Sequence, residues 1–151
     1  MGDIERLIAI EAIKRLKAAY FRCMDERAWD EFATLFTDDV IFDARGALEM
    51  PKPDDEYEEE PIVGASAVVD YARTGLTPLI SVHSAHMAEI DILDSHNARG
   101  TWPMHDMLIA PPGAPFRIFR GWGHYRETYR KTGDRWQIAT LRLRRLYVQT
   151  E

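Results

Sequence analysis

The sequence predicts an α+β fold with helices in its first half and an antiparallel sheet in its second half. Two patterns carry this prediction. Apolar residues recur at steps of three and four residues over the first third of the chain, which is the period of a helix. The second half consists of long β-rich segments separated by short turns. Helices that are segregated from an antiparallel sheet in this way pack against it as a separate layer.

The first helix is expected over residues 3–27, which contain neither Pro nor Gly. Its apolar stripe includes Ile13, Leu16 and Tyr20, whereas Lys14, Arg15 and Lys17 are assigned to the opposite face. The stripe consists of Ile4, Leu7, Ile8, Ile13, Leu16, Tyr20, Cys23 and Met24. A second, short helix over 29–36 and a short strand over 40–42 are expected to follow.

An irregular loop is expected over residues 45–61, because three prolines interrupt a run of like charges there. A third helix is expected over 63–76. Four strands then follow over 79–93, 98–110, 116–131 and 136–148, joined by turns such as Thr132-Gly133-Asp134. We expect a single domain over 1–151, since this length buries one core but is short for two.

The charge of the protein is concentrated in one segment. The net charge of the 151 residues is −6, and residues 49–60 carry seven acids against Lys52, so the other residues sum to zero. An acidic protein is a poor partner for nucleic acid. The single cysteine, Cys23, forms no internal disulfide, and neither a secretory signal nor a membrane-spanning run is visible. We therefore expect a cytoplasmic protein without nucleic-acid or membrane partners.

Four polar residues stand where a water-poor cavity would use them: Tyr20 on the first helix, Asp25 near its end, and His83 and Asp106 on two of the strands. A charged group within an apolar strand is costly unless it is paired. A histidine held by a carboxylate is the usual general base near neutral pH. Each residue also has a structural interpretation: Tyr20 as core, Asp25 as an N-cap of the second helix, Asp106 as a solvated strand residue and His83 as a structural histidine.

The order of the elements resembles the NTF2-like fold, in which a curved antiparallel sheet wraps around a long N-terminal helix to form a cone. Within that fold, residues 10–32 (IEAIKRLKAAYFRCMDERAWDEF) resemble the first helix of the SnoaL-like branch, and of the bile acid 7α-dehydratases in particular. Further similarity is found at residues 80–86 and 98–109 and around Tyr125, Tyr129 and Trp136. Scytalone dehydratase and hexachlorocyclohexane dehydrochlorinase are more distant relatives.

The resemblance implies a catalytic set of Tyr20, Asp25, His83 and Asp106 and a dehydratase that uses neither cofactor nor metal. His83 would remove a proton from carbon, Asp106 or Asp25 would fix its tautomer, and Tyr20 would donate to an oxygen of the substrate. The implied substrate is a hydrophobic ring compound such as a steroid or a polyketide. A ketosteroid-isomerase-like proton-transfer enzyme and a non-catalytic small-molecule binding module are the alternatives.

The predicted pocket contains His86, Trp102, Met104, Phe119 and Tyr125 in addition to the catalytic set. His86 competes with His83 for the role of base, because the two have opposite parity in a regular strand and only one can face the core. His86 shares its parity with Ala88, Ile90 and Ile92, which assigns His86 to the buried face and His83 to the exposed one. His83 reaches the cavity only if the strand carries a bulge, or changes its covered face, between the two; we prefer His83 on the resemblance. A metal site at these histidines is disfavoured, since no third ligand lies nearby in the sequence.

Two further features bear on recognition. The acidic segment 49–60 has no clear counterpart in the bile acid enzymes, and it is either a solvated loop or a lid over the cavity. Arg142, Arg144 and Arg145 are interpreted as solvated or as partners of acids across a subunit interface; a site for a carboxylate or CoA-bearing substrate is the alternative. We expect a homo-oligomer formed through the open face of the sheet, with a trimer favoured over a dimer.

Overall fold

The computed structural model describes all 151 residues and has the expected two layers. The helices are α1 (Asp3–Glu26), α2 (Trp29–Ala33), α3 (Ala65–Leu76) and one 3₁₀ turn, η1 (Asp54–Glu56). The strands are β1 (Phe36–Asp43), β2 (Ile62–Val63), β3 (Ile80–Ala85), β4 (Glu89–Ile92), β5 (Asn97–Ile109), β6 (Ile118–Thr132) and β7 (Arg135–Thr150). The α+β prediction is therefore confirmed.

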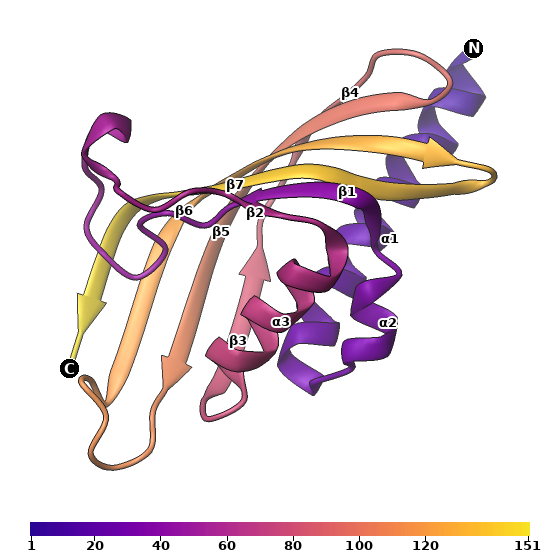
Figure 1. The fold of residues 1–151 in the computed structure, drawn as a ribbon. Coiled ribbons are helices and arrows are strands. Elements are labelled where there is room, and N and C mark those ends of the chain that lie inside the picture. Colours follow the sequence, from indigo (N-terminus) through magenta and orange to yellow (C-terminus); the bar gives the residue numbers. More distant parts are fainter.

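One curved sheet organises the fold. Its strand order is β2-β1-β7-β6-β5-β3, and β4 pairs with β5 beyond the end of β3. The long strands β5, β6 and β7 bend strongly, and the helices lie on the concave side of the bend (Figure 1). One detail of the prediction is wrong: β1 pairs with β7 in parallel, so the sheet is mixed rather than entirely antiparallel.

The strand expected over 79–93 is interrupted, and this interruption decides which histidine faces inward. β3 and β4 both pair with β5, while residues 86–88 between them belong to neither strand. The interruption resets the alternation of side chains, so His83 lies on the concave side with 6% of its side chain exposed, whereas His86 is exposed. The second helix is also shorter than expected, because the chain enters β1 at Phe36 instead of Val40.

The core lies between α1, α3 and the concave face of the sheet. Ile13, Tyr20 and Phe32 are almost completely buried there, and Phe32 packs against Phe36 with ring centroids 4.9 Å apart. Lys17, which was assigned to the solvated face of the first helix, is also buried. The assignment fails because Lys17 follows Ile13 by four residues and precedes Tyr20 by three, which places all three on one side of the helix.

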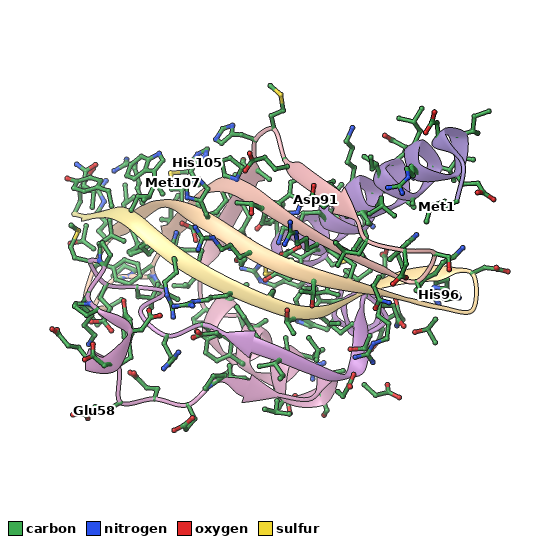
Figure 2. The ribbon with its side chains drawn as sticks, turned by 90° about the horizontal axis from the view of Figure 1, so that it is seen from above. Met1, Glu58, Asp91, His96, His105 and Met107 are labelled. Carbon is green, nitrogen blue, oxygen red and sulfur yellow. The ribbon has the colours of Figure 1, made fainter.

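The outer face of the sheet carries the opposite set of residues. His105 and Met107 of β5 project from this face, away from the helices (Figure 2). The ring of His105 stacks between His86 and Trp122, with centroids 5.9 and 6.4 Å away. No helix of the structure has the length and apolar character needed to cross a membrane.

Candidate active site

A cavity of about 240 Å³ lies between the helices and the bent sheet. Its walls are mostly apolar and include Met24 of α1, Tyr71 of α3 and Leu143 of β7. Its polar groups come from five elements of the fold. They are Tyr20 of α1, His83 of β3, Asp106 of β5, Tyr125 of β6 and Arg145 of β7.

His83 is held from behind by Asp25. Its Nδ1 lies 2.6 Å from Asp25 Oδ1, and its backbone N–H donates to Asp25 Oδ2 at 2.8 Å. A carboxylate accepts hydrogen bonds, so this contact assigns the ring proton to Nδ1. Nε2 then carries a free lone pair on the side of the cavity. Its distance of 3.9 Å from Asp106 Oδ2 is too long for a hydrogen bond, so Nε2 is available as a base.

The end of α1 positions Asp25. Arg27 terminates the helix in the left-handed conformation (φ 62°), and its guanidinium donates to Ser81 Oγ at 2.8 Å and to the carbonyl of Leu76 at 2.7 Å. Ser81 Oγ in turn donates to Asp25 Oδ1 at 2.9 Å. The ends of α1 and α3 and the start of β3 are thus joined at one guanidinium, directly beside the His83–Asp25 pair.

Burial on its own would raise the pKa of Asp25, but the hydrogen bonds from His83 and Ser81 outweigh it and lower that pKa. The ionised carboxylate is therefore maintained above this lowered pKa and lost as the pH falls through it. Ser81→Ala removes one of the donors and is expected to raise the pKa of the Asp25 carboxyl. The measurement is an NMR titration of the Asp25 side-chain carboxyl carbon in both proteins; a pKa that does not move, or moves lower, contradicts the prediction.

Asp106 is paired with Arg145 in a bidentate arrangement. Arg145 Nη1 and Nη2 each lie 2.8 Å from one oxygen of Asp106, and the exposed fractions of the two side chains are 2% and 5%. Gly121 of β6 makes room for this pair, since a Cβ there would lie 2.3 Å from Arg145 Nη1. Two parallel charge-assisted hydrogen bonds fix both groups in orientation at the cavity wall.

Two phenols form the neighbouring part of the wall. The hydroxyls of Tyr20 and Tyr125 lie 3.5 Å apart, and both residues are buried. Burial raises the pKa of Tyr20 well above its usual value, and Tyr125 adds to this effect. Burial likewise raises the pKa of Tyr125. Both hydroxyls are thus protonated at neutral pH and can donate a hydrogen bond.

Comparison with known proteins identifies the family. The model of the SnoaL-like domain matches residues 5–142. The chain belongs to the SnoaL-like family. The probable cyclase FGR4 of Gibberella zeae is 27% identical to this SnoaL-like chain over 144 residues, covering 92% of each.

Solved structures of similar fold span almost the whole chain. Type 2 hexachlorocyclohexane dehydrochlorinase (LinA) superimposes with a TM-score of 0.80 at 16% identity, covering 99% of this chain and 93% of its own. A proposed scytalone dehydratase from Novosphingobium aromaticivorans superimposes with a TM-score of 0.81 at 18% identity, covering 99% and 92%. At these identities the likeness establishes the NTF2-like cone, with its sheet folded around the first helix.

The structure brings the four residues of the predicted catalytic set together, although not in every expected arrangement. Tyr20, His83 and Asp106 line the cavity, and Asp25 lies behind His83. Asp106 stands opposite His83 in the β3–β5 register, as adjacent strands require. The carboxylate that contacts the imidazole at hydrogen-bond distance is nevertheless that of Asp25, because Arg145 holds both oxygens of Asp106.

Four of the five predicted pocket residues lie elsewhere, and only Tyr125 lines the cavity. His86 is on the outer face, because the chain leaves the sheet at residues 86–88. Trp102 donates to the hydroxyl of Tyr129 at 2.7 Å within the core. Met104 and Phe119 are also buried, and the Arg145 guanidinium separates both from the cavity. Met104 Sδ lies 3.5 Å from Arg145 Nη1, and the centroid of the Phe119 ring lies 5.2 Å from Arg145 Cζ.

Arg145 is the main residue that the sequence analysis missed. It was grouped with Arg142 and Arg144, yet it shares the parity of the buried residues Leu141 and Leu143, and this alternation was the available signal. Arg142 and Arg144 point to the other face and pair within the chain, both of them with Asp43 and with Asp54 of the acidic segment. Within the chain these two arginines therefore hold this segment, and their role at a subunit interface stays a prediction.

The acidic segment 49–60 lies against the outer side of β7. Tyr57 is buried there beneath the guanidinium of Arg144, 5.4 Å from its ring centroid, whereas Glu58 marks the outer edge of the loop (Figure 2). None of these twelve residues lines the cavity; Ala47 and Leu48, just before them, do. Three carboxylates of the region, those of Glu49, Glu59 and Glu60, line a neighbouring groove that also contains Leu48 and Tyr71.

Proposed function

We propose that this SnoaL-like protein is a cofactor-free dehydratase that eliminates water from a hydrophobic ring compound. The observation that carries the proposal is a histidine whose Nδ1 is held by Asp25 at 2.6 Å and whose Nε2 faces an apolar cavity. A base oriented in this way, with a phenol donor across the cavity, has the two groups that an elimination needs. The resemblance to the bile acid 7α-dehydratases points to the same chemistry.

In this reaction Nε2 of His83 takes a proton from the carbon next to an activating carbonyl group. The electron pair of that C–H bond becomes part of a new carbon–carbon double bond, and the bond from the neighbouring carbon to its hydroxyl breaks. The hydroxyl leaves as water with the proton of Tyr20, and the imidazolium then returns a proton to the phenolate. Asp25 stabilises the imidazolium in between, and the Asp106–Arg145 pair fixes the wall beside the reacting atoms.

The cavity also suggests which substrates to test. Its volume of about 240 Å³ lies below the range of roughly 300–1,000 Å³ that is typical of sites for drug-sized ligands. A compact ring system of polyketide type is therefore favoured over a complete four-ring steroid. The carboxylates of Glu49, Glu59 and Glu60 beside the cavity favour an uncharged substrate over an anionic CoA thioester.

The test is incubation with hydroxylated cyclic ketones of polyketide and 3-oxo steroid type, followed by mass spectrometry. We expect a product lighter by one water. Gly75→Phe, which fills the cavity from α3 where a Cβ meets no other atom, should lower the rate by about 10²-fold or more. A new product of unchanged mass would instead support an isomerase, and a ligand that binds without turnover would support a binding module.

A cyclase is the second candidate, favoured by the similarity to the probable cyclase FGR4 over 92% of the chain. The same base could remove a proton from carbon to start an intramolecular carbon–carbon bond formation. Such a product keeps the substrate's mass but contains one more ring, which NMR of the isolated product distinguishes from an isomerised double bond.

A further inference from the structure

A buried ion pair lies beneath the phenols of the cavity and is separate from the four residues of the predicted catalytic set. Lys17 of α1 contacts Glu127 of β6, and the exposed fractions of their side chains are 1% and 0%. Two apolar side chains of similar volume would avoid the desolvation of both ions, so a buried pair is weak evidence for a role in stability. Its position against the two phenols indicates another role.

The pair has a fixed orientation. Lys17 Nζ lies over the rings of Tyr20 and Tyr125, 4.0 and 3.7 Å from their centroids, and both rings line the cavity. The negative end is held away from the cavity, because Glu127 Oε2 accepts a hydrogen bond from the Tyr129 hydroxyl at 2.5 Å. The ion pair is thus a dipole whose positive end faces the two phenols.

We infer that Lys17 is a positioning residue whose ammonium, oriented by Glu127, strengthens Tyr20 as a hydrogen-bond and proton donor to an oxygen in the cavity. The inference rests on the proposed function for the identity of that oxygen. Negative charge grows on the phenol as its O–H bond breaks, and the attraction of a nearby cation grows with it. An interaction that is stronger in the transition state than in the ground state accelerates the reaction, although Lys17 touches no substrate.

Several other groups act on the Tyr20 hydroxyl. Burial is the main factor that raises the pKa of Tyr20, followed by Tyr125, Glu127 and Tyr71. His83, Asp106 and Arg145 face it across the cavity. Burial lowers the pKa of Lys17, and Glu127 counteracts this by favouring the ammonium. In the proposal this ammonium, which lies over the ring of Tyr20, opposes the increase in the pKa of the phenol. Its removal should therefore leave a phenol that is harder to ionise.

The test compares the protein with the double variant Lys17→Met/Glu127→Gln, which removes both charges and nearly preserves volume. Trifluorotyrosine, whose phenol is far more acidic than that of tyrosine, replaces Tyr20 in both. We expect ¹⁹F NMR titration without ligand to give a label pKa about one pH unit higher in the double variant, a tenfold change in acid dissociation. An equal or lower pKa overturns the inference, because it means that the charge of Glu127 offsets or outweighs that of Lys17 at the phenol. This titration needs no turnover, so its result is independent of whether the proposed dehydration is correct.

Two controls separate this effect from a loss of structure. The same label at Tyr71, which lines the cavity from α3, should titrate equally in both backgrounds. If this double variant does not fold, Lys17→Leu/Glu127→Met makes the same test, since it also removes both charges and two apolar side chains can replace a buried ion pair without loss of stability. Once a substrate is known, kcat should fall about tenfold in the double variant while KM changes less than twofold; a change in KM alone would contradict the inference.

Discussion

The substitution His83→Asn is expected to lower kcat/KM by about 10²–10⁴-fold, the range that general acid–base catalysis contributes. Asparagine is of similar size and keeps a polar group beside Asp25, but it has no nitrogen that can take a proton from carbon. The measurement is a steady-state assay on the substrate identified by mass spectrometry, with circular dichroism to verify the fold.

His86→Asn is the matched control, because His86 is three residues away on the outer face, where its ring stacks on His105. Its activity should stay within about twofold of the parent, as for an ordinary surface substitution. If His86→Asn lost activity and His83→Asn kept it, the assignment of the base would be wrong, and the residue on the outer face would have to act in another arrangement of the chain.

The sequence predicted the class of fold and the approximate extent of most elements. Periodicity predicted α1 and the long strands correctly, since both depend on local spacing. It failed at residues 86–88, where the chain leaves the sheet and returns, because a continuous apolar alternation predicts one strand. The conflict between the parities of His83 and His86 results from this interruption. It could be recognised as an interruption only once the pairing of β3 and β4 with β5 was known.

The predicted site was limited in a different way. The residue types of Tyr20, Asp25, His83 and Asp106 were recognisable, but the carboxylate that would hold the imidazole was left open between Asp25 and Asp106. The structure associates Asp25 with His83 and Asp106 with Arg145, a residue 39 positions away. Pairing across such distances depends on strand register and on the space left by Gly121, neither of which local periodicity reveals.

The stability of the fold is expected to depend on both partners of the Arg145–Asp106 pair. Arg145→Met should lower the free energy of unfolding by about 3–5 kcal/mol, because it leaves the carboxylate of Asp106 buried without its partner. Arg145→Met/Asp106→Leu should recover most of this loss, since two apolar side chains need no desolvation of charge. Urea denaturation of the parent, both single variants and the double variant gives the four free energies of a double-mutant cycle.

Activity should not follow stability in this series. The double variant regains its fold but lacks both charged groups at the cavity wall beside His83, so its kcat/KM should stay as low as that of the single variants. The combination of restored stability with lost activity distinguishes a pair that serves the site from one that only holds β5 to β7. If the double variant recovered both its free energy of unfolding and its kcat/KM, the pair would act through the fold alone. If the losses of stability in the two single variants were additive, the two side chains would not be coupled in solution.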